Sequence, residues 1–554
     1  MTEFICDDFT TVKYLKDNIQ TTIDYDKFFT GLTFTTNLTD LDIKMLGCWN
    51  GECQTDLKIS HKDSIQQGKI NNLLQTYDKY HNVTNKFRFF FGDNIYYPAD
   101  EKKIIKNKKN GEDETNRQIY ENLVNLNIYD STSSTFVMTD IIKKKMITFN
   151  PLQRAKEIID KGFECINPQH IPTFHALGNH DVEFEYILKY QIQKSYINTN
   201  ILPNNNITFS SWILPSAFYA VKFNVSQNNK DINLMFIIID TNLLLPDGYE
   251  NINSINGNIE EYKSRMFTWL KSILSDPSNE IYFKVLIGHQ PIYNYKHKIK
   301  TEDKQNNEIN NSMLELYNLL TNNVTDVMPE KIHTLTVTQL ASEGESTEDD
   351  AAEEGTGEGE KEGEVADEDI QLQKIHMYVC ADEHNLQSLY DINNNIYHII
   401  CGASPGGGGS DQAQTFDDQL NIPFSSTKIL MPEDESFNIE KRLVLNSPSF
   451  LHLQVTPLLL QLNIIGPENL NLHNNYFCKM NVCEPNLSDI PIVYDIIAFP
   501  KYRDYIAIYK CQEYQQKTCG SPSEEQTGGY SSYNDYNLYT ISKLISRSLQ
   551  KLLR

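Results

Sequence analysis

Five short segments carry side chains that bind metal ions or hold phosphate, and each follows directly on a short apolar run. They are Gly47-Cys48-Trp49-Asn50-Gly51, Gly92-Asp93-Asn94-Ile95-Tyr96, Gly178-Asn179-His180-Asp181, Gly288-His289-Gln290-Pro291 and Asp382-Glu383-His384-Asn385. In an open α/β sheet, ligands bind at the carboxyl ends of the strands, and glycine lets the chain turn sharply there. Two cations about 3.5–4 Å apart can share one carboxylate and hold a phosphate group. The pattern therefore predicts a metal-dependent phosphoester site.

Six apolar runs predict the buried strands, and five of them lead directly into these segments. They span 42–47, 87–92, 173–178, 233–240, 282–288 and 376–381. Helix-like stretches lie between them at 151–162, 259–274 and 311–320. This alternation is typical of a layered α/β fold with buried strands.

The last four of these segments, in this order, resemble the motifs GDNxY, GNHD, GHxP and a late histidine-containing element of calcineurin-like metallophosphoesterases, and the first segment stands where that family has an aspartate after its first strand. The tyrosine of the first motif and the run His384-Asn385-Leu386-Gln387 are most similar to tartrate-resistant (purple) acid phosphatases. Other similar segments are 212–219, 239–241 and 269–271. The resemblance covers about residues 40–470. It implies an αββα sandwich, in which two mixed sheets face each other, helices flank them, and the site lies at the strand ends.

The resemblance also implies a role for each residue at the site. The first metal set becomes Cys48, Asp93, Tyr96 and His384, and the second becomes Asp93, Asn179, His289 and Asp382. His180 would be the transition-state hydrogen-bond donor or general acid, oriented by Asp181, and Asn94 and His297 would face the substrate. The implied cofactors are divalent ions of zinc, iron or manganese, and the sequence leaves open whether two, one or none are bound. The implied substrate is a phosphomonoester.

Two positions depart from the pattern of the family. Cys48 stands where the family has aspartate, and Ala381-Asp382-Glu383-His384 stands where it has Gly-His-Asp-His. A thiolate favours zinc-like cations over ferric iron. An aspartate at position 382 is shorter than histidine, and its negative charge weakens the Lewis acidity that attack on phosphate requires. Each departure also has a structural explanation, an ordinary buried thiol for Cys48 and a solvated turn residue for Asp382.

The two departures favour a degenerate centre, in which a single zinc-like ion binds on the Cys48 side and the Asn179–His289 side is empty or weak. The first hypothesis is therefore a pseudophosphatase that acts as a scaffold or binding module for a protein partner. The second is an active phosphomonoesterase with an atypical dinuclear site that uses Cys48 and Asp382. The third is a mononuclear metal-binding protein with weak phosphatase activity.

Composition limits the partners and the setting of the protein. Of the 554 residues 40% are hydrophobic, which is enough for a large core, and no apolar run approaches the roughly 18–20 residues of a membrane-spanning helix. The net charge of −25 argues against a nucleic-acid partner, because phosphate binding needs clustered Lys and Arg. The N-terminus has neither a basic nor an apolar leader region, so we expect no signal peptide and an intracellular, cytoplasmic protein. In that setting the ten cysteines are expected to be free thiols or metal ligands rather than disulfides.

The predicted organisation is an N-terminal segment (1–40), a metallophosphoesterase-like domain (41–470) and a Tyr-rich C-terminal extension (471–554). Two insertions interrupt the domain, at about 101–146 and 321–371. The second is of low complexity, with fourteen acidic residues and one lysine between 341 and 370, and is expected to be disordered. The C-terminal helix carries Lys543, Arg547, Lys551 and Arg554 near one face. It is either a packed surface helix or a peripheral contact with an anionic membrane or a partner.

Overall fold

The structure is a computed structural model of the 554-residue chain. The residues that it describes are 2–18, 22–49, 70, 74–75, 85–96, 136–140, 145–149, 151–227, 230–292, 294–295, 311–321, 324–325, 372–391, 393–402, 424–425, 439–445, 449–455, 459–467, 491–500 and 507–510. His297, the acidic segment 341–370 and the basic C-terminal helix lie outside these residues. The sequence-based predictions for them stay predictions.

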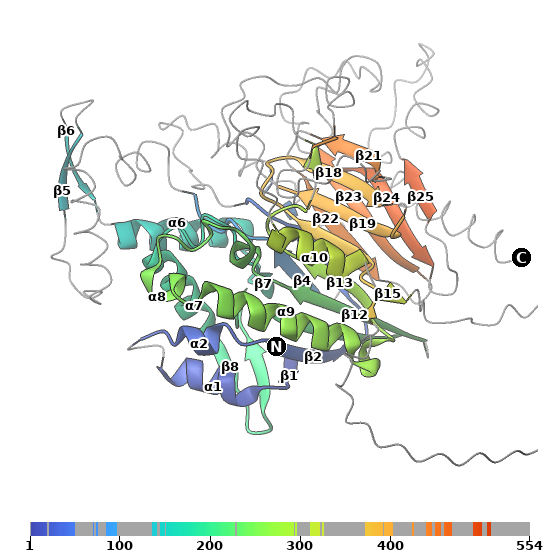
Figure 1. Cartoon of the computed structure of the whole chain (residues 1–554), viewed down its shortest axis with the longest axis horizontal. Helices are drawn as coiled ribbons and strands as arrows, with labels where there is room; N and C mark the ends of the chain where they lie inside the picture. Colours follow the sequence, from blue (N-terminus) through green and yellow to red (C-terminus); the bar gives the residue numbers. More distant parts are fainter. Residues whose placement is uncertain are drawn as a thin grey trace, which may run out of the picture.

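Two large sheets form the fold (Figure 1). The larger sheet has the strand order β21 (Ile439–Leu445), β18 (Leu386–Asp391), β19 (Ile396–Cys401), β17 (Met377–Cys380), β13 (Phe283–Ile287), β12 (Lys230–Ile238), β11 (Tyr219–Gln227), β2 (Leu32–Leu38), β1 (Glu3–Cys6), β9 (Asn206–Phe209) and β8 (Thr199–Ile201). The smaller sheet has the order β10 (Trp212–Ile213), β7 (Thr173–His175), β4 (Lys86–Phe90), β3 (Asp42–Leu46), β22 (Phe450–Val455), β23 (Leu459–Pro467), β24 (Pro491–Pro500) and β25 (Ala507–Lys510).

Both sheets are mixed, and each has a parallel centre that ends at the candidate site. Strands β3, β4 and β7 run parallel in the smaller sheet, and β12, β13, β17 and β19 run parallel in the larger one. The predicted strands at 42–47, 87–92, 173–178, 233–240, 282–288 and 376–381 correspond to β3, β4, β7, β12, β13 and β17. The two sheets meet where Gly47 pairs with Gly402 and the Gly47 N–H donates to the Cys401 carbonyl, 2.9 Å away. The donor segments of both sheets therefore face one junction.

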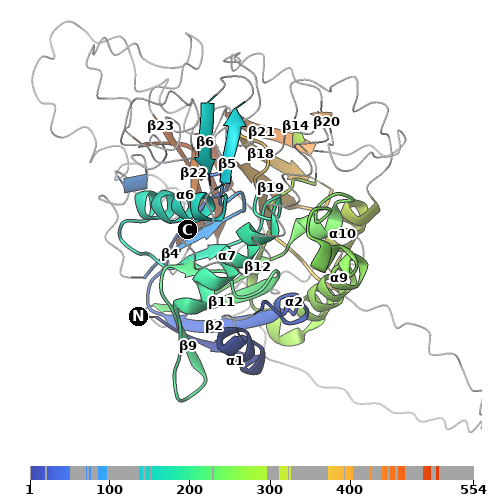
Figure 2. The ribbon, with the colours of Figure 1, turned by 90° about the vertical axis from the view of Figure 1, so that its left-hand side faces the viewer.

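The core lies between the two sheets, whose inner faces pack through aromatic rings. The ring of Phe89 on β4 stacks on that of Phe236 on β12 with centroids 4.4 Å apart, and Phe87 meets Phe223 at 4.9 Å. Helices cover the outer faces; Figure 2 shows α6 on one side of the strands and α9 and α10 on the other. Their bounds are α1 (Phe9–Asn18), α2 (Tyr25–Phe28), α6 (Pro151–Ile166), α7 (Glu185–Ile197), α8 (Asn253–Asn256), α9 (Ile259–Ser275) and α10 (Asn311–Thr321). The predicted two-sheet α/β sandwich is confirmed.

Parts of the chain outside the motif-bearing region also join the sheets. The N-terminal 40 residues, for which the sequence gives no secondary-structure prediction, contribute β1 and β2 to the larger sheet. Strand β1 pairs antiparallel with both β2 and β9. Beyond residue 470, β24 pairs with β23 and extends the smaller sheet. Small two-stranded sheets join β5 (Phe136–Asp140) to β6 (Lys145–Phe149), β14 (Asn294–Tyr295) to β20 (Phe424–Ser425), and β15 (Val324–Thr325) to β16 (Leu372–Gln373).

The cysteines depart in part from the expectation of free thiols. Cys165 is disulfide-bonded, so the expectation is wrong there. The four other cysteines in the described ranges, Cys6, Cys48, Cys380 and Cys401, are free and buried. Composition cannot reveal a disulfide, because its formation depends on which two thiols the fold brings to bonding distance.

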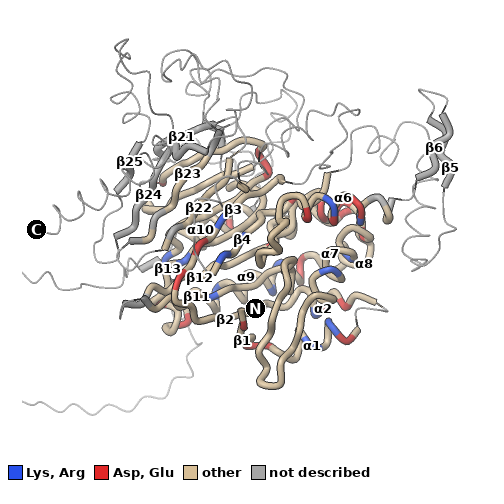
Figure 3. The backbone as a smooth tube through the Cα atoms, turned by 180° about the vertical axis from the view of Figure 1, so that it is seen from behind, with Lys and Arg blue, Asp and Glu red and all other residues tan. Residues whose placement is uncertain are grey.

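Among the described residues, no helix is long and apolar enough to cross a membrane. Figure 3 shows acidic and basic residues interspersed along the backbone of the described part. Helices α1, α6, α7 and α9 each carry both signs of charge. The absence of a nucleic-acid partner stays a prediction.

Candidate metal centre

Three of the donors predicted from the sequence stand on turns with a left-handed backbone. The φ angle is 50° at Cys48, 53° at Asp93 and 60° at Asp382. Residues with a side chain rarely adopt this conformation, which costs about 1–3 kcal/mol and persists only where the surrounding structure enforces it. Strain of this kind gathers at functional sites. All three turns follow strands that end at the junction of the sheets, on β3, β4 and β17.

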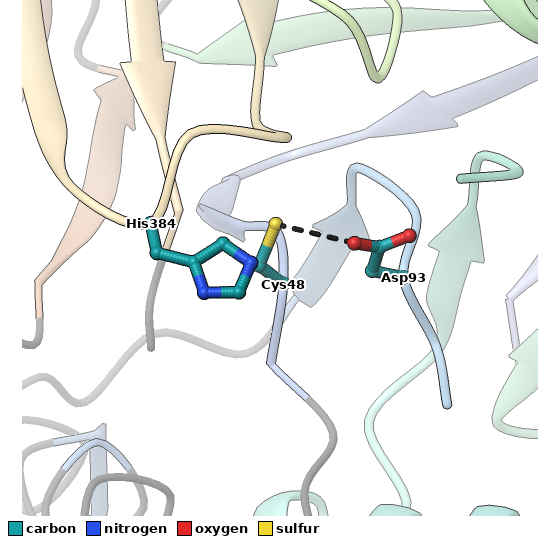
Figure 4. Close-up of side chains that lie close together, drawn as sticks. All are labelled: Cys48, Asp93 and His384. Carbon is teal, nitrogen blue, oxygen red and sulfur yellow. Dashed lines mark hydrogen bonds between the residues drawn. The ribbon is translucent and has the colours of Figure 1, made fainter. Parts of the chain in front are cut away.

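The first cluster of donors contains Cys48, Asp93, Tyr96 and His384. One ligand atom each from Cys48, Asp93 and His384 lies within 4.8 Å of the other two (Figure 4). The Cys48 thiol donates to Asp93 Oδ2 over 3.7 Å, the Tyr96 hydroxyl donates to the same oxygen, and Tyr96 Oη lies 3.1 Å from His384 Nε2. Donors that bind one zinc ion at about 2.0–2.3 Å lie roughly 3–4 Å apart. The donor types and these separations fit a zinc-like ion.

The second cluster gathers around the ring of His289. Its Nε2 lies 3.2 Å from Asp93 Oδ1, 3.2 Å from Asn179 Oδ1 and 3.7 Å from Asp382 Oδ1. On the other side of the ring, Nδ1 lies 2.6 Å from the Phe91 carbonyl oxygen, to which its N–H donates. A backbone acceptor of this kind fixes the ring of a metal-binding histidine and leaves Nε2 for the ion. The other three donors of this cluster thus all lie within 3.7 Å of His289 Nε2.

Asp93 connects the two clusters, because its two carboxylate oxygens face different ways. Oδ2 contacts Cys48 and Tyr96, whereas Oδ1 contacts His289 and accepts the backbone N–H of His180 at 3.2 Å. This is the arrangement of a carboxylate shared between two ion positions.

Glycine allows the loops after β4 and β7 to approach this carboxylate. A Cβ added at Gly178 would lie 2.3 Å from both Asp93 N and Asp93 Oδ1 and 2.9 Å from His289 Cε1. At Gly92, where φ is +86°, a Cβ would lie 2.7 Å from His289 Nδ1. Both glycines are therefore required for the close packing of Asp93 against His289.

We expect Gly178→Ala to lower the free energy of unfolding by about 1–3 kcal/mol or more, because overpacking forces Asp93 and His289 apart. Zinc affinity should fall with it. Gly257→Ala is the matched control, since a Cβ there meets nothing within 4 Å. Thermal unfolding and zinc titration of both variants check this. Equal melting temperatures and equal zinc affinities for the two variants would contradict the packing argument.

The buried floor of the site, formed by Cys48, Asp93 and His289, contains ionisable groups that shift one another's pKa values. Burial alone raises the pKa of Asp93, but the charges of His289 and His180, with hydrogen bonds from His289 and Tyr96, outweigh it and hold that pKa well below its usual range. Burial lowers the pKa of His289, whereas Asp93 and Asp382 raise it to about 9. Burial, together with the charge of Asp93, raises the pKa of the Cys48 thiol well above its usual value. The floor thus pairs the negative Asp93 carboxylate with a positive His289 ring beside a neutral Cys48 thiol, and a metal ion that bound there would displace the protons of His289 and Cys48.

The surroundings of His180 and Asp181 bear on the roles that the resemblance implies for them. His180 Nδ1 lies 3.4 Å from Glu183 Oε2. That Asp181 orients His180 stays a prediction. Asp181 is buried and accepts N–H groups from Gly178, Asn94 and Gln191. Burial and the nearby charge of Asp93 raise its pKa to about 8. The carboxylate of Asp181 thus joins the loops after β4 and β7 to helix α7.

The side chain of Asn94 is fully buried and bonds to the loops around it. That Asn94 faces the substrate stays a prediction. The opening is formed by Asn179, which is exposed, and by the half-buried His180, Asp382 and His384. The floor is formed by Cys48, Asp93 and His289, which are at most 2% exposed. Burial of the donors thus ranges from complete at Cys48 and His289 to exposed at Asn179.

No protein-family profile matches the chain, and no curated protein matches it. Among the solved structures that are similar at low identity are the following three. "GAP50 the anchor in the inner membrane complex of Plasmodium" is 16% identical, with a TM-score of 0.34, over 77% of this chain and 85% of that one. Purple acid phosphatase PPD1 from yellow lupin (Lupinus luteus) seeds is 9% identical, with a TM-score of 0.33, over 78% of this chain and 53% of that one. PhoD is 10% identical, with a TM-score of 0.35, over 86% and 74%. At TM-scores this low, none of the three carries a functional inference for this chain.

Proposed function

We propose that the protein has a phosphatase-like metal centre that holds one zinc-like divalent ion and serves mainly as a binding module, with weak phosphoester chemistry. The observation that supports the ion most strongly is the group of Cys48, Asp93 and His384 ligand atoms within 4.8 Å of one another. Thiolate, carboxylate and imidazole are the ligands that zinc takes in proteins. Tyr96 would complete this set, since its hydroxyl contacts both Asp93 and His384.

An ion bound there would supply Lewis acidity to a phosphoryl oxygen. The residues at the opening would supply the hydrogen bonds and the proton. The ring of His180 lies 4.7 Å from that of Tyr96 between centroids and would donate a hydrogen bond or a proton to a phosphomonoester. The exposed amide of Asn179 would help to hold the phosphate group.

The acidic residues after β17 argue for weak turnover. Asp382 and Glu383 are half-buried at the opening, where their negative charges oppose a phosphate group. Asp382 also replaces the neutral imidazole that the resemblance implies. We therefore keep as our first proposal a degenerate centre with one ion, whose main role is to bind a protein partner and whose turnover of phosphoesters is weak.

One observation favours a second candidate, an active dinuclear phosphomonoesterase. The two oxygens of Asp93 face different clusters, and Asp382 Oδ1 comes within 3.7 Å of His289 Nε2. Both ion positions would then have enough donors.

The test of these proposals is metal content by elemental analysis of protein purified without chelator, with a phosphomonoester assay on the same sample. One zinc-like ion per chain with weak turnover supports the first proposal. Two ions with robust turnover support the second. Protein that stays free of metal, even after incubation with zinc, and shows no turnover would contradict both metal centres and support a scaffold that binds no ion.

Replacing Cys48 with serine should locate the ion. We expect cobalt-substituted wild-type protein to show the intense thiolate-to-cobalt charge-transfer absorption, and Cys48→Ser to lose it, because the thiolate is the source of that band. Cys401→Ser is the matched control, since Cys401 is also a free, fully buried thiol but donates to the Ser449 carbonyl at 3.6 Å. A band that survives in Cys48→Ser would place the ion elsewhere.

A further inference from the structure

The buried side chain of Asn94 joins the loops that carry the metal donors. Its Oδ1 accepts the indole N–H of Trp49 at 2.9 Å and lies 3.0 Å from His175 Nδ1. Its Nδ2 donates to the Ala176 carbonyl at 3.0 Å, to Asp181 Oδ2 at 3.1 Å and to Gln191 Oε1 at 3.2 Å. The amide thus bridges the ends of β3, β4 and β7 and helix α7.

These partners are close neighbours of the donors in the sequence. Trp49 follows Cys48, and Asn94 follows Asp93. Asp181 comes two residues after Asn179 and binds the backbone N–H of Asn94 at 2.9 Å. A displacement of the Asn94 amide would therefore move Cys48 and Asp93 directly.

The two turns joined in this way are the strained ones at Cys48 and Asp93, with φ angles of 50° and 53°. Such angles persist only where the surroundings enforce them. The backbone contributes one constraint, since the N–H of Cys48 donates to the Gly92 carbonyl at 3.1 Å. The Trp49–Asn94 hydrogen bond is a second, independent constraint between the same two turns.

The surroundings of Asn94 also explain why the residue is an amide. Its oxygen faces two N–H groups, whereas its nitrogen faces three acceptors, on Ala176, Asp181 and Gln191. Gln191 in turn donates to Asp181 Oδ1 at 3.1 Å, which closes a ring of hydrogen bonds. A carboxylate at position 94 would place an oxygen against three acceptors, which costs free energy in a buried site.

We propose that Asn94 is a positioning residue for the metal centre, and that its hydrogen bond from Trp49 sets the separation of Cys48 Sγ from Asp93 Oδ2. This inference rests on the proposed function, since it assigns to Asn94 control over the affinity and geometry of that ion. Neither Asn94 nor Trp49 touches the ion; both act through the residue that precedes them.

The test is the pair Trp49→Phe and Trp212→Phe. Both tryptophans are fully buried, and both substitutions remove an indole N–H. The Trp49 N–H donates to Asn94, whereas the Trp212 N–H has no hydrogen-bond partner in the described part of the chain.

We expect zinc affinity, measured by competition with a chromogenic chelator, to fall about tenfold in Trp49→Phe and to stay within about twofold in Trp212→Phe. The reason is that outer-shell partners of metal ligands contribute about 10- to 100-fold to metal affinity. The thiolate-to-cobalt band should shift or weaken only in Trp49→Phe, an effect that a purely structural role would not produce.

A second pair, Asn94→Asp and Asn167→Asp, applies a stronger change. Asn167 is also fully buried, and its Nδ2 donates to the Ile171 carbonyl at 2.7 Å, away from the donor turns. We expect zinc affinity to fall about a hundredfold in Asn94→Asp and to stay unchanged in Asn167→Asp. If Asn94→Asp does not fold, the tryptophan pair decides. Wild-type protein that binds neither zinc nor cobalt would contradict the proposed function together with this inference. Wild-type binding with equal affinities and identical cobalt spectra in Trp49→Phe and Trp212→Phe would overturn the inference alone.

Discussion

Asp93→Asn is expected to abolish zinc binding, because both donor clusters depend on this carboxylate. One oxygen faces Cys48 and Tyr96, and the other faces His289. The substitution keeps the volume but removes a negative charge and replaces one acceptor oxygen with a donor N–H₂ group. The loss should exceed the roughly 10- to 100-fold that an outer-shell partner contributes. Elemental analysis and chelator competition measure it.

Asp391→Asn is the matched control for this substitution. Asp391 is 1% exposed, and its carboxylate accepts the backbone N–H of Asn394 at 3.1 Å and the Asn394 side chain at 2.8 Å, at the turn between β18 and β19. We expect Asp391→Asn to lower the melting temperature and leave zinc affinity unchanged. Zinc bound with equal affinity by the wild type and Asp93→Asn would mean that the ion lies outside both clusters.

Much of the fold could be predicted from the sequence because its central strands are short, apolar and contiguous. Strand β13 lies within the predicted run 282–288, and β3 lies within 42–47. Strand β1 could not be predicted in this way. It has four residues, only alternate ones are buried, and its partner β9 lies about two hundred residues further along the chain. The alternation of burial also does not show in the residue types, because the exposed Ile5 is as apolar as the buried Phe4 and Cys6.

The donors of the candidate site could be predicted because chemically distinctive residues follow successive strands. The residues that hold these donors in place could not be predicted. Glu183 beside His180, and Trp49 bonded to Asn94, are ordinary residue types whose partners are set only by the folded loops. The position of the Asp382 carboxylate could not be predicted either, because it depends on the backbone conformation of the folded loop. An argument from side-chain length alone expects a carboxylate to stop short of the place an imidazole reaches, but a left-handed turn with φ of 60° brings Asp382 Oδ1 to 3.7 Å from His289 Nε2.

The double variant Cys48→Asp with Asp382→His is expected to raise phosphomonoesterase activity about tenfold or more, which corresponds to about 1.4 kcal/mol of transition-state stabilisation. Histidine at position 382 would remove a negative charge from the opening and give the second cluster a neutral nitrogen donor. Aspartate at position 48 would replace the thiolate with a harder ligand. The metal content should rise from one ion towards two in the same preparation.

The two single variants serve as controls, because each restores one departure alone. Asp382→His should account for most of the gain, since it acts where the phosphate group would enter, whereas Cys48→Asp alone should change mainly which metal is bound. A gain in metal content without a gain in turnover would show that the opening, including Glu383, still excludes phosphate. Robust wild-type turnover with two ions bound, lost in Asp382→Ala, would instead make Asp382 a working ligand. The protein would then be an active enzyme with an atypical dinuclear site, because its activity would require the Asp382 carboxylate that we expect to weaken the centre.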